Sequence, residues 1–245
     1  MSITERQQRI LELVQEHGYI SVERLSVLTY TSPSSIRRDL NTLGNLMLIK
    51  RTHGGASPYD SMGHAVPLRS RMEQNIAEKR QIAKKAAALL EDGQTVMLDG
   101  SSTAGFLVPH IAKHKDMTVF TNNMHTAVGA INYGITTHCI GGESVDHSAV
   151  LSGIWAYRTV AELNPDIVFF SSQSLDKNGV ISDPIAEENY IRTLMLERAR
   201  FSVFLCDSAK FGSESLYRLT TVDRIDACVF DKPYAELRTR CRIIV

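Results

Sequence analysis

The chain has 245 residues, of which 43% are hydrophobic and 22% are charged, a composition typical of a soluble globular protein. Its 27 basic and 27 acidic residues balance, so the overall charge indicates neither a nucleic-acid nor a membrane partner, and such a partner must show itself in local patches. No apolar run approaches the ~20 residues of a membrane span, so we expect a cytoplasmic protein with no membrane partner. The 4 cysteines include no C-x-x-C pair and are expected to be reduced.

The first 31 residues predict two short helices. Thr4 and Gln7 have the spacing of a capping box at the start of the first helix, and Gly18 is placed to end it. Ser21 is placed to cap the second helix, and Tyr30 begins the turn that follows.

The next stretch predicts a third helix with one apolar and one polar face. Ser32 is a natural N-cap, and Pro33 suits the first helical position because its missing N–H is not needed there. The apolar face carries Ile36, Leu40 and Leu43 at helical spacing. The polar face begins with hydroxyls and arginines, namely Ser34, Ser35, Arg37 and Arg38. A helix of this kind can lie in the major groove of DNA with its first turns against bases and phosphates.

A hairpin is predicted from residue 48 to residue 57, around Gly54 and Gly55. Between Arg37 and Arg51 there are four basic residues against one acid, Asp39, a local net charge of +3. Such a patch can bind phosphates, although an ordinary solvated helix face is the alternative. Two short helices, a tight turn and a following hairpin predict a winged helix-turn-helix domain over residues 1–58.

Residues 59–75 contain proline and glycine and little apolar periodicity, which predicts a linker. A helix is predicted over residues 77–91. We expect its basic residues to lie on a solvated outer face; they are Lys79, Arg80, Lys84 and Lys85.

From residue 95 onward, short apolar runs alternate with helical segments, which predicts a mostly parallel sheet covered on both faces. The strands are expected at 95–98, 117–120, 136–140, 167–170, 202–206 and 227–230, and the helices at 102–113, 124–132, 153–163 and 186–200. We therefore expect residues 76–245 to form one α/β domain.

Ligands of such sheets lie at the carboxyl ends of the strands, where polar loops meet helix N-termini. The loops selected by this rule are residues 99–103, 121–123 and 141–143 after the first three strands, and residues 206–212 late in the chain. Backbone N–H groups, hydroxyls and one ammonium group can together hold a phosphate. Each loop alone can be an ordinary turn or surface charge, but several of them in one domain favour a binding site.

The sequence favours neither a metal site nor a catalytic nucleophile. His110 and His114 are spaced to face one way on a helix but have no acidic third ligand, and no G-x-S-x-G motif is present. We expect no metal, no cofactor and no enzymatic activity.

Four segments carry a family resemblance: R-I-L-E-L-V, Y-I-S-V-E-R-L, S-S-I-R-R-D-L and K-R-T-H-G-G-A. In order and spacing they resemble the DNA-binding module of the DeoR family of bacterial transcriptional regulators. The resemblance implies DNA contacts by Ser34, Ser35, Arg37 and Arg38 from the recognition helix, and by Lys50, Arg51 and His53 from the wing. We expect Asp39 to orient a neighbouring arginine or the helix end, because a carboxylate facing phosphate is repelled.

The loop residues also match, in order, the effector-binding domain of that family, which resembles folds of the ribose-5-phosphate isomerase type. The resemblance implies a pocket for a phosphorylated sugar or polyol. Nine loop residues would line it: Asp99, Gly100, Ser101, Ser102, Thr103, Thr121, Asn122, Gly142 and Lys210. Two positions depart from the family pattern. Residues 171–174 replace a glycine-rich turn with S-S-Q-S, and Ile191 stands where a lysine is expected, which implies the loss of a cation.

The favoured hypothesis is a repressor of a carbohydrate-metabolism operon, relieved by a phosphorylated sugar. It would bind double-stranded operator DNA as a homo-oligomer, because two-fold half-sites require at least a dimer. One alternative is a phosphosugar isomerase with an accessory DNA module, in which Asp99, Asp176, Glu187 and Lys210 would supply acid, base and electrophile. The other is an architectural DNA-binding protein whose α/β domain only oligomerises.

Overall fold

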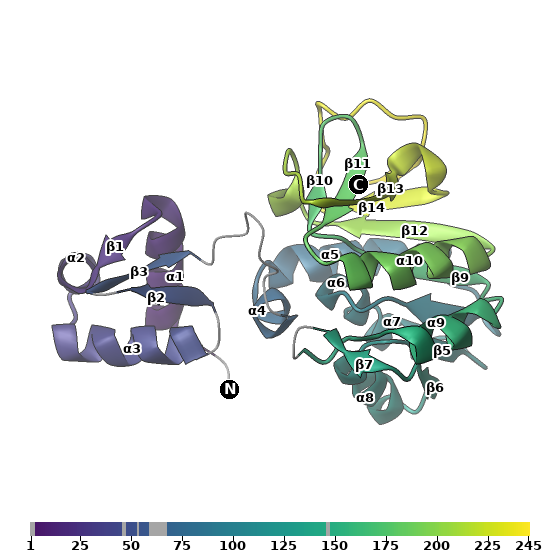
Figure 1. The fold of residues 1–245 in the computed structure, drawn as a ribbon, viewed down its shortest axis with the longest axis horizontal. Coiled ribbons are helices and arrows are strands. Elements are labelled where there is room, and N and C mark those ends of the chain that lie inside the picture. The colour runs from purple at the N-terminus through teal and green to yellow at the C-terminus, as the bar shows by residue number, and fades with distance from the viewer. Residues whose placement is uncertain (1–2, 46–47, 53, 59–67, 146–147) are drawn as a thin grey trace. The chain divides into compact units, whose positions relative to one another are not determined.

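The computed structural model describes residues 3–45, 48–52, 54–58, 68–145 and 148–245 (Figure 1). The chain divides into two compact units, Met1–Ser70 and Arg71–Val245. After the functions expected from the sequence, we call the first the DNA-binding unit and the second the sensor unit, and each is described by itself. No helix in the described ranges is long and apolar enough to cross a membrane.

The DNA-binding unit combines three helices with a small antiparallel sheet. Its elements are α1 (Glu5–His17), β1 (Ile20–Ser21), α2 (Val22–Leu28), α3 (Pro33–Asn45), β2 (Ile49–Thr52) and β3 (Gly55–Pro58). The sheet has the order β1-β3-β2, with β2 and β3 paired as the predicted hairpin. The winged helix-turn-helix predicted from the sequence is therefore confirmed, and β1 adds a strand where only an extended link was expected.

Local capping and one apolar core explain these elements. The Thr4 hydroxyl accepts from Gln7 N at 3.2 Å, and the Gln7 side chain accepts from Thr4 N at 3.0 Å, as a capping box requires. The Ser32 hydroxyl accepts from Ser35 N at 3.3 Å at the start of α3. The core residues with no exposed surface include Ile10, Val14, Leu25, Ile36, Leu40 and Leu43.

The sensor unit is built on a seven-stranded, all-parallel sheet with the order β15-β14-β12-β9-β4-β5-β6. Its strands are β4 (Thr95–Leu98), β5 (Thr118–Thr121), β6 (Thr136–Cys139), β9 (Ile167–Phe170), β12 (Phe201–Cys206), β14 (Ala227–Phe230) and β15 (Arg242–Ile244). Two small antiparallel sheets accompany it: β7 (Glu143–Ser144) with β8 (Leu151–Ser152), and β10 (Ser174–Leu175), β11 (Val180–Asp183) and β13 (Tyr217–Thr221).

Helices lie on the faces of the large sheet (Figure 1). They are α5 (Ile76–Ala86), α6 (Ser102–Gly105), α7 (Val108–Ile111), α8 (Met124–Asn132), α9 (Ile154–Ala161) and α10 (Ala186–Arg198). Successive strand residues point to opposite faces, so Val96 and Leu98 pack in one core with Ile82, while Met97 packs in another with Ile191. The helix α4 (Leu68–Glu73) spans the boundary between the two units in the chain.

The structure departs from the sequence prediction at several elements. The helix expected over 102–113 is divided into α6 and α7, and the helix expected over 77–91 ends as a 3-10 turn at Ala87–Leu89. The β10-β11-β13 sheet and the edge strand β15 were not predicted. These strands have two to five residues each, which is too short for an apolar periodicity to stand out.

Candidate functional site

The surface of α3 and the hairpin carries the residues expected to contact DNA. Because Ile36, Leu40 and Leu43 are buried on one side, the opposite side of α3 faces solvent. Of the predicted DNA contacts, Ser34, Arg37, Arg38, Lys50 and Arg51 are exposed and Ser35 is half-buried. His53 lies outside the described residues.

Asp39 lies on α3 but points away from this surface. It is buried and accepts from Arg6 Nε at 2.7 Å, Arg6 Nη2 at 3.1 Å and Gln7 Nε2 at 3.1 Å. The carboxylate therefore connects α1 to α3 and holds an arginine, although not the neighbouring one that was expected. The arginine is Arg6 on α1, a partner that local spacing did not indicate.

In the sensor unit, the loop after β4 carries five of the nine residues predicted to bind the effector, Asp99 to Thr103. Asp99 is fully buried, and its Oδ1 accepts from Ser101 N at 3.1 Å and also from Ser101 Oγ. Ser101 in turn caps α6 by accepting from Ala104 N at 3.2 Å. The loop is thus held by its own side chains before any ligand binds.

Lys210, which follows β12, is connected to Asp99 through Ser171. Its Nζ donates to Ser171 Oγ at 2.9 Å and lies 3.3 Å from Asp207 Oδ2. Ser171 follows β9, and its backbone N donates to Asp99 Oδ2 at 3.4 Å. Ser171 therefore connects Asp99 to Lys210. It is the first residue of the S-S-Q-S segment that departs from the family pattern, and its hydroxyl accepts from Lys210.

The loop after β5 joins the β4 loop on its other side. Asn123 Nδ2 donates to Gly100 O at 3.0 Å, and Asn122 Nδ2 donates to Leu151 O at 2.8 Å. A Cβ on Gly100 would lie 2.5 Å from Val150 Cγ1, so only glycine fits there without a shift. Gly142 packs elsewhere, against β8, where a Cβ would lie 2.3 Å from Ser152 O.

Two polar atoms among the predicted residues lack a partner within the described residues. Thr103 Oγ1 and Asn122 Oδ1 are buried and make no hydrogen bond there. Buried polar atoms are usually hydrogen-bonded, so these two favour a polar ligand at this edge of the sheet.

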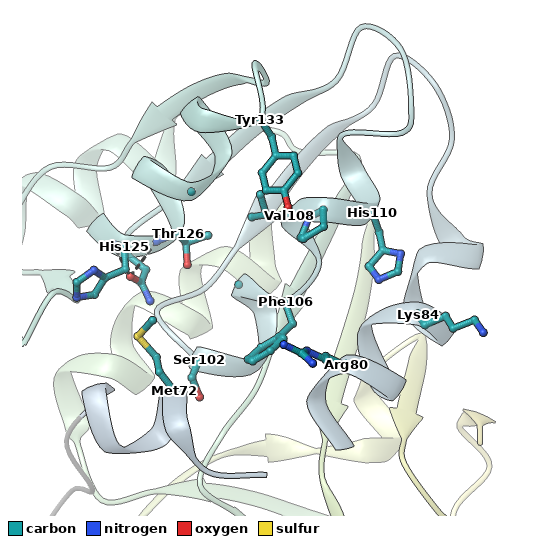
Figure 2. Close-up of a pocket in the computed structure, with 14 residues that line it drawn as sticks. Met72, Arg80, Lys84, Ser102, Phe106, Val108, His110, His125, Thr126 and Tyr133 are labelled. Atoms are coloured by element: carbon teal, nitrogen blue, oxygen red, sulfur yellow. Dashed lines mark hydrogen bonds between the residues drawn. The ribbon is translucent and has the colours of Figure 1, made fainter. Parts of the chain in front are cut away.

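A cavity of about 590 Å³ opens between α5, α6, α7 and α8 (Figure 2). Its wall includes the apolar side chains Met72, Phe106, Val108 and Tyr133, and the basic residues Arg80 and Lys84 lie at its edge. Of the nine predicted effector residues, only Ser102 lines it. This cavity is therefore a neighbour of the Asp99 and Lys210 cluster and does not contain it.

Arg192 is a residue that the sequence reasoning missed. It is 1% exposed, and it donates from Nε to Asp99 Oδ2 at 2.8 Å, from Nη1 to Asp183 Oδ2 at 3.0 Å and from Nη2 to Glu188 Oε2. Ile191 itself packs in the apolar core, and its neighbour Arg192 is the buried cation beside Asp99. The i,i+4 spacing of Glu188 and Arg192 was a signal that could have pointed to it.

Lys79 was also misplaced by the sequence reasoning. It is 3% exposed, and its Nζ donates to Gln74 O at 2.6 Å and to Arg71 O. Burial, followed by the charge of Lys210, lowers the pKa of Lys79 to about 7. Lys79 is spaced with Ile82, Ala83 and Ala86 on the buried side of α5, whereas Arg80 and Lys84 are exposed as expected.

Comparison with known proteins decides the family. The DeoR-like helix-turn-helix domain matches residues 6–61, and the DeoR C terminal sensor domain matches residues 74–232. The chain belongs to the DeoR family. It is a DNA-binding transcriptional regulator, as the relatives matched over nearly the whole chain are.

Three relatives of this DeoR-family regulator match it over more than nine-tenths of the chain. The HTH-type transcriptional regulator GolR of Listeria innocua is 32% identical over 228 residues, which are 93% of this chain and 90% of the relative. The glycerol-3-phosphate regulon repressor of Escherichia coli is 28% identical, over 95% of this chain and 92% of the relative. The L-fucose operon activator of Haemophilus influenzae is 32% identical, over 93% and 91%.

Among solved structures, the ribose 5-phosphate isomerase A of Methanocaldococcus jannaschii is similar over 56% of this chain and 55% of that chain, with 16% identity and a TM-score of 0.43. The isomerase alternative is not favoured for the DeoR-family regulator, because its relatives are regulators of transcription. Within the described residues, no group of three His, Cys, Asp or Glu side chains is arranged to hold a metal ion.

Proposed function

We propose that this regulator represses a carbohydrate-metabolism operon and that a phosphorylated sugar or polyol relieves the repression. The observation that carries the proposal is the cluster at the carboxyl edge of the sheet, where Ser171 connects the Asp99 loop to Lys210. An ammonium group and hydroxyls there suit a phosphate ester with hydroxyl groups, as do two buried polar atoms of the β4 and β5 loops that make no hydrogen bond within the described residues.

The proposed ligand contacts are the loop residues after β4, β5 and β12: Asp99, Gly100, Ser101, Ser102, Thr103, Thr121, Asn122 and Lys210. Gly142 stays in the proposed site as a residue of the neighbouring loop. The name of the Escherichia coli relative, a repressor of the glycerol-3-phosphate regulon, supports an effector of this chemical class. The Haemophilus influenzae relative is named an activator, so the relatives include both repressors and activators of transcription.

The proposed DNA contacts are Ser34, Ser35, Arg37 and Arg38 on α3, with Lys50, Arg51 and His53 on the hairpin. Hydroxyls and arginines there would bind phosphates and base edges of a double-stranded operator. We further propose that the protein binds as a homo-oligomer, because each copy reads one half-site. A protein with this function would work in the cytoplasm, where bacterial and archaeal DNA lies.

The proposed functions belong to three consecutive segments of the chain. Residues 1–58 would bind DNA, residues 59–75 would link the two domains, and residues 76–245 would bind the effector and oligomerise.

The test uses the full chain. Duplexes that bind are selected from a random library, and the selected duplex is titrated in the presence of phosphorylated sugars and polyols, with the unphosphorylated compounds as controls. We expect one phosphorylated compound to weaken DNA binding at least ~fivefold and to raise the melting temperature, and Lys210→Ala to abolish both effects. If no member of the panel changes either quantity, the proposed effector class is wrong.

A further inference from the structure

Buried ion pairs form a continuous series from α4 to the Asp99 loop. Arg71 on α4 donates from Nη2 to Glu188 Oε1 at 3.1 Å. The other carboxylate oxygen of Glu188 accepts from Arg192, whose Nε donates to Asp99 Oδ2 at 2.8 Å. Asp183 is the remaining member, at 3.0 Å from Arg192 Nη1.

These side chains are shielded from water, so their charges depend on one another. The side chain of Arg71 is 12% exposed, and those of the other four members are at most 2% exposed. Two arginines face three carboxylates, so the loss of either cation adds to an excess of buried negative charge. Burial alone would raise the pKa of Glu188, but Arg71 and Arg192 together bring it below its ordinary value.

A second connection leads from the same segment to Lys210. Just after α4, Asn75 Nδ2 donates to Asp207 Oδ1 at 2.9 Å, and Asp207 Oδ2 lies 3.3 Å from Lys210 Nζ. Lys79 Nζ holds the end of α4 by donating to the backbone oxygens of Arg71 and Gln74. Residues 71–75, which we call the latch, are therefore connected to proposed effector residues along two routes, through Glu188 and Arg192 to Asp99 and through Asp207 to Lys210.

We propose that docking of the latch and binding of the anionic effector strengthen each other, with Arg71, Asn75 and Arg192 as positioning residues. This inference rests on the proposed effector site. A bound anion attracts the Lys210 ammonium group away from Asp207, so the Asp207 carboxylate accepts more strongly from Asn75. The negative charge of the anion also favours the protonated form of Lys79, whose side chain holds the end of α4. The latch is the first segment of the sensor unit and directly follows the DNA-binding unit in the chain. The proposed coupling would therefore act on the segment through which the two units are connected.

The coupling is reciprocal by thermodynamic necessity. A bound anion should slow the exchange of latch amides, and a loosened latch should weaken anion binding, although Arg71 touches none of the proposed effector residues. Neither effect is expected from an ion pair that only stabilises the fold.

The experiment measures hydrogen exchange of residues 71–75 and calorimetric affinity for inorganic phosphate, on the full chain. We expect phosphate to slow exchange of the latch in the wild type, and Arg71→Gln to weaken phosphate binding by about fivefold or more. Arg71→Lys should restore most of the affinity. The control is Arg200→Gln, which breaks the surface pair of Arg200 and Asp166 and should bind as the wild type does.

A second variant covers the case in which Arg71→Gln does not fold. Asn75 is exposed and has a left-handed backbone with φ of 52°, so Asn75→Gly removes the amide while keeping that conformation accessible. It should also weaken phosphate binding.

Two negative results have different meanings. In the first, Lys210→Ala abolishes phosphate binding, but phosphate does not change the exchange of the latch amides and Asn75→Gly binds phosphate as the wild type does. This result would overturn the proposed coupling and leave the effector site intact. A wild-type protein that binds no phosphate would overturn the effector site and the latch together.

Discussion

Lys79 shows how the surroundings of a single residue change its chemistry. Its ammonium group lies inside the sensor unit, close enough to Lys210 for the two charges to repel, and its pKa falls to about 7 from the ordinary 10.5. The folded protein therefore gives up this proton near neutral pH, while the unfolded chain keeps it to about pH 10. The difference makes stability depend on pH.

We predict that the free energy of unfolding rises between about pH 7 and pH 10 because of Lys79. In this window the unfolded state binds more protons at this position than the folded state, so stability increases with pH, by at most about 5 kcal/mol for the shift to about 7. Urea unfolding at several pH values measures it. In Lys79→Met the rise should be smaller, and an identical slope in both proteins would contradict the lowered pKa.

Residue types alone did not reveal the buried charges. The sequence reasoning selected Asp99 and Lys210 because each follows a strand, a rule that depends only on order in the chain. Arg192 and Lys79 lie within helices, and their burial depends on which helix face packs against the sheet. That orientation is a tertiary property, and the i,i+4 spacing of Glu188 and Arg192 is equally typical of a surface pair.

Among the elements, those defined by local chemistry were the best predicted. The capping box at Thr4, the N-cap at Ser21 and the start of α3 at Pro33 each need only neighbouring residues, and all three are confirmed. The break between α6 and α7 and the small antiparallel sheets need distant partners, such as the pairing of β11 with β13. Such partners cannot be read from a local pattern.

Two glycines on different elements should respond in opposite ways to alanine. Gly129 lies within α8, and a methyl group added there would meet open space, so Gly129→Ala should stabilise the protein by about 0.5–1 kcal/mol through helix propensity. Gly142 has a φ of 140°, and the backbone oxygen of Ser152 occupies the place of a Cβ, so Gly142→Ala should cost about 2–4 kcal/mol. Thermal unfolding compares the pair, and a stabilising Gly142→Ala would contradict the described loop.

For the whole molecule, the two compact units predict that DNA binding and effector binding can be impaired separately. Arg37→Ala should weaken binding to the selected duplex by about 1–3 kcal/mol and leave effector affinity unchanged, because Arg37 is exposed on α3. Lys210→Ala should do the reverse. Gel-shift titration at fixed salt and calorimetry measure the two affinities.

The matched control is Arg9→Ala, which removes another exposed arginine of the same unit, one that pairs with Glu12 outside the proposed DNA contacts. It should bind DNA as the wild type does. Equal losses in Arg9→Ala and Arg37→Ala would mean that only the net charge matters, and the assignment of α3 as the recognition helix would fail.

The cavity between α5 and α8 has a practical consequence. It shares Ser102 with the proposed effector loop, and its lining does not include Lys210. A compound with an aromatic or alkyl body and an acidic group would suit its apolar wall and basic edge. Such a compound would lie beside Ser102 without imitating a sugar, so this cavity is a second place at which to look for ligands of the regulator.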